Sequence, residues 1–155
     1  MVYFSKTSTT PDQTILIGKK LGSILQSGDV VTLSGELGAG KTWLTKGIAL
    51  GLDIADKDTV ISPSFTIINE YQGRLTIFHM DFYRLAAGDD ADLGLEEYLY
   101  GSGVTIIEWP ERMAEILPDD RMAVTLLVED DKRQIIFEPK GNKWVERLEK
   151  LFNNL

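Results

Sequence analysis

The sequence predicts an α/β fold of three layers, with a mixed, mainly parallel central sheet between two layers of helices. Three observations lead to this prediction. Short runs rich in Val, Ile and Thr alternate with longer amphipathic segments along the chain. A strand-like run, Val30–Ser34, passes through a glycine-rich turn into a helix-like run. Two β-rich runs, 65–71 and 74–80, then flank Gln72-Gly73, which is typical of an antiparallel hairpin and not of simple alternation.

The length of 155 residues predicts a single domain over residues 1–155, which is large enough for a substantial core. The absence of cysteine excludes disulfides and thiolate metal sites. No apolar run approaches the roughly 20 residues that span a bilayer, and the first residues lack the apolar segment of a signal peptide. We therefore expect a cytoplasmic protein without membrane contact. The net charge of −8 argues against strong direct binding of nucleic acid.

The N-terminal part predicts a strand, a helix and a second strand. Residues 2–6 are typical of a short edge strand. Thr10 suits a helix N-cap, Pro11 suits the first helical position, and Gln13 completes a capping box. Apolar residues then recur at helical spacing until the chain enters Val30–Ser34.

The stretch after this strand matches G-x-x-x-x-G-K-[ST], the phosphate-binding loop (P-loop) of nucleoside triphosphatases. The motif consists of Gly35, Glu36, Leu37, Gly38, Ala39, Gly40, Lys41 and Thr42. Its glycines allow backbone N–H groups to face phosphates, and the following helix, 42–50, adds its N-terminal N–H groups. The fold expected is therefore P-loop NTPase-like.

Two side chains of the motif have specific roles in this interpretation. Lys41 can reach the β and γ phosphates of a nucleoside triphosphate, and the Thr42 hydroxyl can be a ligand for Mg²⁺. The alternative is a glycine-rich turn between a strand and a helix that binds nothing. The four fixed residues of the motif, together with the strand and helix around it, favour the phosphate-binding interpretation.

The predicted hairpin ends at Asp81, where α/β sheets bind ligands. Its carboxylate is placed to hold Mg²⁺ directly or through water, and the alternative is a turn or helix-capping aspartate. His79 alternates along the same strand and is expected on the face of Asp81. We favour a hydrogen-bonded structural histidine over a catalytic one.

A similar strand ends at Glu108 after a predicted surface loop, 86–92, and a predicted helix, 93–100. Glu108 is a candidate ligand of Mg²⁺ or a residue that orients the attacking water, and the alternative is a solvated side chain. Trp109 either shields the site or belongs to the core.

The remaining elements are a helix opened by Pro110 and extending to Leu117, two strands at 122–128 and 134–137, and a final amphipathic helix, Lys143–Asn153. The two strands are joined by a charged turn, 129–133.

Taken together, the motifs closely resemble the TsaE family of small bacterial ATPases of tRNA threonylcarbamoyladenosine synthesis. The segments that carry the resemblance are the P-loop, Ser62-Pro63-Ser64-Phe65-Thr66, His79-Met80-Asp81-Phe82-Tyr83-Arg84 and Glu108-Trp109-Pro110-Glu111-Arg112. One departure is Ser64, where the family often has threonine; both residues carry a hydroxyl.

The resemblance implies a Mg²⁺-dependent ATPase that works with the partners TsaD and TsaB and reaches tRNA through that complex. It implies catalytic roles for Lys41, Asp81 and Glu108, with Thr42, Asp81 and Glu108 at the metal. Ser62, Thr66 and Trp109 fall in segments that resemble a nucleotide-sensing switch. Thr10 and Arg133 lie near the family's contacts to the nucleotide base.

Two other functions stay open at this point. A small-molecule kinase would need an acceptor pocket and an arginine-rich lid, and no arginine-dense segment is present. A nucleotide-gated binding module would not need the two acidic strand ends. GTP is disfavoured because the Asn-Lys-x-Asp guanine motif is absent. No arginine finger is evident apart from the candidates Arg84 and Arg112, so we predict weak hydrolysis alone and faster hydrolysis with a partner.

Overall fold

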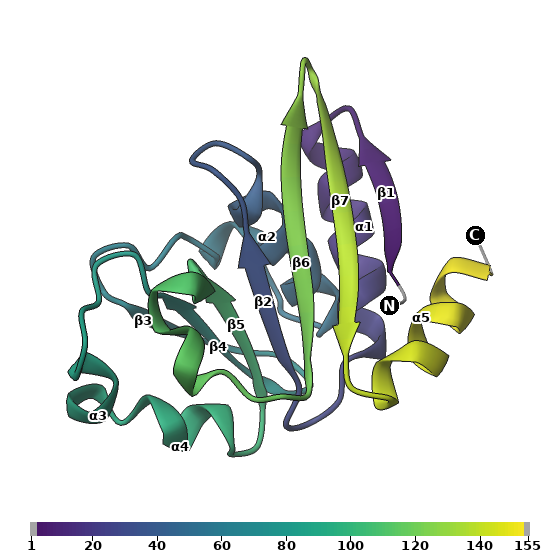
Figure 1. Cartoon of the computed structure of the whole chain (residues 1–155). Coiled ribbons are helices and arrows are strands. Elements are labelled where there is room, and N and C mark those ends of the chain that lie inside the picture. Colours follow the sequence, from purple (N-terminus) through teal and green to yellow (C-terminus); the bar gives the residue numbers. More distant parts are fainter. Residues whose placement is uncertain (1–2, 154–155) are drawn as a thin grey trace.

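A seven-stranded sheet runs through the middle of the molecule (Figure 1). The structure is a computed structural model, and it describes residues 3–153. The strand order is β1-β7-β6-β2-β5-β4-β3. The bounds are β1 (Phe4–Ser8), β2 (Val30–Ser34), β3 (Ile68–Gln72), β4 (Thr76–Asp81), β5 (Val104–Glu108), β6 (Arg121–Glu129) and β7 (Lys132–Lys140). Strands β6, β2, β5 and β4 pair in parallel, whereas both sides of the sheet are antiparallel. The predicted mixed sheet with a parallel centre is confirmed.

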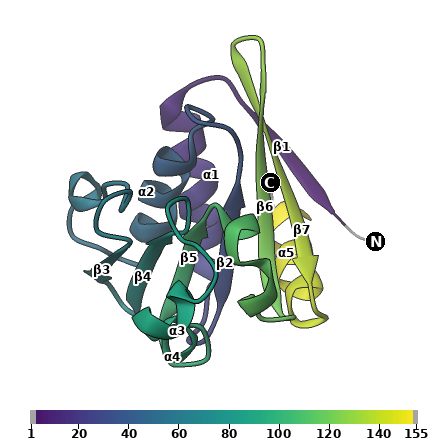
Figure 2. The ribbon, with the colours of Figure 1, turned by 60° about the vertical axis from the view of Figure 1, so that its left-hand side comes forward.

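Helices cover both faces of this sheet, which completes three layers (Figures 1 and 2). The helical elements are α1 (Pro11–Ile24), α2 (Lys41–Gly51), η1 (Lys57–Thr59), α3 (Asp89–Leu93), α4 (Leu95–Leu99), η2 (Pro110–Ile116) and α5 (Lys143–Asn153), of which η1 and η2 are 3₁₀ helices. One apolar core joins the sheet to α1, α2 and α5. The core on the other face contains Met80 and Ile107 of the sheet together with side chains of α4 and η2.

Helices α1 and α2 pack backbone to backbone through glycines. A methyl group added at Gly47 of α2 would lie 2.9 Å from the Cα of Gly18 and even closer to the carbonyl oxygen of Ile15. One added at Gly51 would lie 2.8 Å from the Cα of Gly22. The close approach therefore fixes α2, which begins at the P-loop, against α1.

The C-terminal helix is tied to the sheet by Asp29, which immediately precedes β2. The Asp29 side chain is buried, and its carboxylate accepts hydrogen bonds from Arg147 Nη1 at 2.7 Å and Lys143 Nζ at 3.1 Å. It also accepts one from the Gln26 N–H at 2.7 Å. A single buried carboxylate therefore anchors α5 to the rest of the fold.

The first helix begins as predicted, with one difference. The Thr10 hydroxyl accepts a hydrogen bond from the Gln13 N–H at 3.1 Å, and Pro11 is the first helical residue. The Gln13 side chain bonds the N–H of Thr9 at 2.7 Å, one residue before the expected partner. The edge strand occupies Phe4–Ser8 where the prediction was 2–6, and Val2 of that prediction lies outside the described residues.

The region between β4 and β5 differs from the prediction. Residues 86–92 were expected as a loop, but α3 occupies Asp89–Leu93, and the predicted helix 93–100 is reduced to α4. Gly88 and Gly94 adopt left-handed φ values of 95° and 65°; Gly88 precedes α3, and Gly94 separates α3 from α4. Aspartates in the first turn of α3 complement the positive end of its dipole.

Three element boundaries also differ. Strand β3 begins only at Ile68, because Ile67 has a left-handed φ of 69° that interrupts the predicted run 65–71. The β6–β7 hairpin closes at Glu129↔Lys132, so its strands are longer and its turn shorter than predicted. The helix predicted from Pro110 to Leu117 is present as η2, which ends one residue earlier, at Ile116, and is a 3₁₀ helix with a kink at Met113.

Candidate P-loop site

The P-loop joins the carboxyl end of β2 to the first residue of α2. Gly38 and Gly40 have φ values of 82° and 105°, a region that side chains strongly disfavour. A Cβ at Gly35 would lie 2.9 Å from the carbonyl oxygen of Leu126. The glycine pattern in the sequence therefore corresponds to real requirements of the backbone.

Lys41 lies at the mouth of the loop. Its ammonium donates a hydrogen bond to the Gly35 carbonyl at 2.6 Å and lies 3.9 Å from the centre of the Trp109 ring. Burial lowers the pKa of Lys41, and the nearby carboxylates of Glu108 and Asp81 oppose this effect. The side chain is thus already held beside the loop, facing two negative charges.

Asp81 and Glu108 end neighbouring parallel strands and are direct register partners. Both side chains are buried, with Asp81 6% and Glu108 3% exposed. Burial raises the pKa of Asp81; a hydrogen bond from the Tyr83 N–H at 2.9 Å opposes this, and the Glu108 charge adds to it. The register therefore places two carboxyl groups side by side at the end of the sheet where the P-loop lies.

These residues line one hollow of about 430 Å³, which we call the P-loop pocket. Its lining consists of Leu37, Gly38, Gly40, Lys41, Thr42, Trp43, Ser62, Ser64, Asp81, Tyr83, Arg84, Glu108 and Trp109. Segments far apart in the sequence thus meet at one place. The sequence did not single out Trp43 as a pocket residue. Tyr83 could have been found, because it belongs to the motif that begins at His79.

Thr10 and Arg133 lie on the other side of the loop. Together with Gly38, Gly40 and Trp43 they line a smaller hollow of about 120 Å³, the Thr10 hollow. Arg133 Nη2 donates a hydrogen bond to the Gly38 carbonyl at 3.4 Å. The two predicted base contacts therefore share a cavity that adjoins the phosphate loop.

Several predicted residues do not line the P-loop pocket. The Thr66 side chain is exposed and donates to Asn69 Oδ1 at 2.7 Å, whereas Ser62 of the same segment reaches the pocket. Glu36 is exposed at the loop tip, and Ala39 is buried in the core. Trp109 adopts a left-handed φ of 55°, which turns the chain directly after Glu108.

His79 is fully buried and bonds Glu108, with 2.7 Å between Nε2 and Oε2. Its Nδ1 lies 3.4 Å from the Tyr71 hydroxyl. Strand alternation predicted the face of His79, and a hydrogen-bonded histidine was the favoured interpretation. Its partner could not be predicted, because the register between β4 and β5 is not visible in the sequence.

The donors present fit Mg²⁺. The pocket offers the Thr42 hydroxyl and the two carboxylates, which are hard oxygen ligands. Residues 3–153 contain no cluster of three or more His, Cys, Asp or Glu side chains arranged to hold a metal. This sparse set suits an ion that keeps waters and shares substrate phosphates, and not a closed structural metal site.

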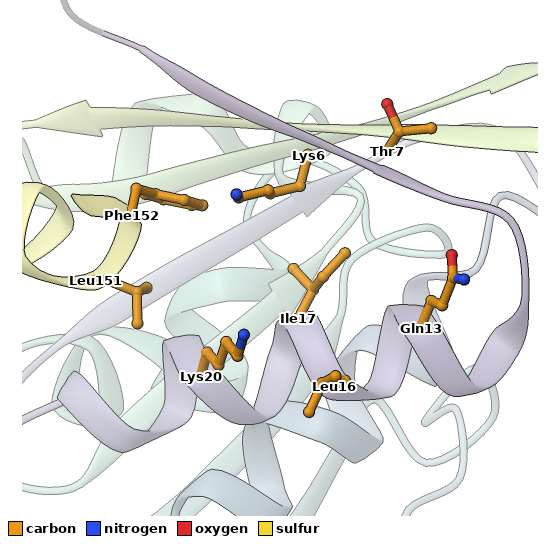
Figure 3. Close-up of a pocket in the computed structure, with 8 residues that line it drawn as sticks. All are labelled: Lys6, Thr7, Gln13, Leu16, Ile17, Lys20, Leu151 and Phe152. Atoms are coloured by element: carbon orange, nitrogen blue, oxygen red, sulfur yellow. The ribbon is translucent and has the colours of Figure 1, made fainter. Parts of the chain in front are cut away.

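A separate groove of about 300 Å³ lies between β1, α1 and α5 (Figure 3). Lys6 points toward the Phe152 ring across this groove, with its ammonium 5.2 Å from the ring centre. The lining includes apolar Leu16 and Ile17 but no acidic residue. The groove is thus distinct in place and chemistry from the P-loop pocket.

Among the helices of residues 3–153, none has the length and apolar character needed to cross a membrane.

The strand–loop–helix unit, the parallel centre of the sheet and the acidic strand ends define the P-loop NTPase class of α/β fold. Within this class, the chain belongs to the TsaE family. The model of that family, described as threonylcarbamoyl adenosine biosynthesis protein TsaE, matches residues 8–135.

Curated relatives and a solved structure agree with this assignment. The tRNA threonylcarbamoyladenosine biosynthesis protein TsaE of Bacillus subtilis is 43% identical over 93% of this chain and 90% of its own length. That of Treponema pallidum is 46% identical over 83% of this chain and 95% of its own. The crystal structure of Bacillus subtilis YdiB superposes with a TM-score of 0.83 at 37% identity, covering 99% of this chain and 96% of that one. The resemblance found in the sequence is confirmed.

Proposed function

We propose that this protein binds and hydrolyses ATP with Mg²⁺ in tRNA threonylcarbamoyladenosine biosynthesis. ATP turnover would support a TsaD–TsaB complex that modifies the adenosine 3′ to the anticodon. The observation that carries the proposal is the P-loop pocket, in which Lys41, Asp81 and Glu108 meet. Membership of the TsaE family supports the pathway.

Each residue has a defined task in this proposal. Backbone N–H groups of the P-loop and the Lys41 ammonium bind the β and γ phosphates and offset the charge that develops on them. Thr42, Asp81 and Glu108 would hold Mg²⁺, which neutralises charge on the β and γ oxygens when bound. Glu108 also orients the attacking water, and Thr10 and Arg133 contact the base from the Thr10 hollow.

Both candidate arginines lie against aromatic rings. Arg84 lines the P-loop pocket, with its guanidinium 4.3 Å from the centre of the exposed Phe65 ring, whereas Arg112 lies 5.1 Å from the centre of the Tyr83 ring and does not line the pocket. Leu37, at the loop tip, is 78% exposed, and Phe65 is 80% exposed. This apolar rim beside the pocket supports a partner that docks there and completes the site. We therefore expect slow hydrolysis by the chain alone.

Binding tests the foundation of the proposal. Calorimetry with MgATP should show a single site, and Lys41→Ala should weaken it at least about tenfold, because a charge-assisted contact contributes about 1.5–3 kcal/mol. Lys19→Ala is the control, because it removes one exposed positive charge outside the pocket. No affinity for ATP, or equal affinity in both variants, would contradict the proposal.

Rates of ATP hydrolysis test the role of the partners and of Glu108. Single-turnover rates measured with and without TsaD–TsaB should differ, and Glu108→Ala should bind ATP yet hydrolyse it slowly. Equal rates with and without partners would remove the idea of a completed site. Full function of the complex with Glu108→Ala would instead favour a nucleotide-gated binding module.

A further inference from the structure

A row of hydrogen bonds connects the Glu108 carboxylate to the main chain at Ile61. His79 Nε2 bonds Glu108 Oε2 at 2.7 Å, and His79 Nδ1 lies 3.4 Å from the Tyr71 hydroxyl. The Tyr71 oxygen in turn accepts a hydrogen bond from the Ile61 N–H at 3.3 Å. The row crosses three segments, because Tyr71 is on β3, His79 on β4 and Glu108 on β5.

The Tyr71 hydroxyl is held by both main-chain groups of Ile61. It accepts from the Ile61 N–H at 3.3 Å and donates to the Ile61 carbonyl at 3.1 Å, and the same carbonyl also accepts from Asn69 Nδ2 at 3.2 Å. A carboxylate only accepts, so His79 donates from Nε2 to Glu108. The 3.4 Å contact between the Tyr71 hydroxyl and His79 Nδ1 then joins the main chain at Ile61 to the Glu108 carboxylate.

The row begins in a segment that reaches the P-loop pocket. Ser62 and Ser64, which follow Ile61, line this pocket. At the other end of the row, His79 is the only residue among residues 3–153 that hydrogen-bonds the Glu108 side chain. Two side chains, the fully buried His79 and the partly buried Tyr71, thus connect segment 61–64 to the carboxylate.

We propose that Tyr71 and His79 are positioning residues that couple segment 61–64 to Glu108, so that the orientation of this carboxylate depends on where the segment lies. The proposal rests on the proposed function, in which Glu108 orients the attacking water. It assigns no chemical step to His79 itself. Replacing a residue that hydrogen-bonds and orients a metal ligand commonly lowers activity about 10- to 100-fold.

Tyr71→Phe tests the coupling, because it removes one hydroxyl and keeps the ring that packs 6.0 Å from His79. We expect the Kd for ATP to stay within about twofold, while kcat falls about tenfold at saturating ATP. Tyr98→Phe is the matched control, since Tyr98 is similarly half-buried but its ring packs on Phe78, away from the row.

Substitutions at His79 separate positioning from structural support. His79→Leu should lower kcat at least as much as Tyr71→Phe. His79→Gln places an amide donor near the position of Nε2, so it should recover part of that turnover and make Tyr71→Phe nearly neutral. In a Glu108→Gln background, Tyr71→Phe should cause no further loss.

These measurements distinguish the coupling through Tyr71 and His79 from the role of Glu108 in hydrolysis. If Tyr71→Phe and His79→Leu lower only the free energy of unfolding and leave kcat unchanged while Glu108→Gln abolishes turnover, the coupling is wrong and the role of Glu108 stands. If Glu108→Gln itself leaves turnover unchanged, the proposed function of Glu108 fails, and the coupling fails with it.

Discussion

Replacing Gly47 with alanine should destabilise the protein through the contact between α1 and α2. The new methyl group would meet the Gly18 Cα at 2.9 Å and the Ile15 carbonyl at a still shorter distance. Carbon atoms at optimal contact are about 3.5–4.0 Å apart, and both neighbours are backbone atoms, so the helices must separate by roughly 1 Å.

The sign of the effect is decided by two opposing terms. Alanine is a better helix former than glycine by about 1 kcal/mol, which would stabilise an unhindered helix. Overpacking costs about 1–3 kcal/mol and occasionally more, and a clash between backbone atoms belongs at the upper end. We therefore expect Gly47→Ala to lower the free energy of unfolding by about 2 kcal/mol.

Urea unfolding followed by circular dichroism measures this difference. The midpoint should fall while the m-value stays unchanged. Ser23→Ala is the control, because Ser23 is exposed on α1 and its hydroxyl bonds only the Lys20 carbonyl among residues 3–153. Its effect should stay within about 0.5 kcal/mol. A Gly47→Ala protein as stable as the parent, or more stable, would refute the account of the helix contact.

Three further predictions follow from buried groups. Asp81→Asn should raise the free energy of unfolding, measured by denaturation from pH 4 to 7. Because the pKa of Asp81 is raised in the folded protein, its contribution to stability is full below the ordinary value of 3.8 and is lost as pH rises through the raised value. The stability gained by the substitution should therefore grow with pH, and a gain that shrinks with pH contradicts the prediction. MgATP should change tryptophan fluorescence by drawing Lys41 from the Trp109 ring, and most of this change should vanish in Trp109→Phe; an equal change in that variant contradicts it. Asp29→Ala should cost about 3 kcal/mol in urea unfolding, because two cations on α5 lose their carboxylate, and a loss below about 0.5 kcal/mol would contradict this role.

The parts of the site that could be predicted are those encoded by local chemistry. Glycines at 38 and 40 occupy backbone conformations that the motif requires, and Lys41 lies at the mouth of the loop. Asp81 and Glu108 could be placed at strand ends because each follows a short β-branched run. Parallel strands present their carboxyl ends at one edge, so the meeting of these residues also followed from the pattern.

The parts that could not be predicted depend on register and on competition between short segments. The bond between His79 and Glu108 requires a specific alignment of two strands that no local pattern encodes. Helix α3 was missed because small and acidic residues are also typical of loops, and its N-cap is a glycine, which offers no side-chain capping signal. Thr66 was expected in a switch-like segment, and nothing in the sequence indicated that its exposed hydroxyl would bond Asn69 directly before the left-handed residue Ile67.

The pairing of Asp81 with Glu108, and of Glu108 with Leu33, puts three chain segments on a single rung of the sheet. One residue inserted within β4 or β5 would reverse the facing of every later side chain in that strand and remove its carboxylate from the rung. We therefore expect changes in length to be tolerated near Gly88, in the connection between the two strands, but not within the strands themselves. An insertion library across this region should return functional clones with additions near Gly88 and none within Thr76–Asp81.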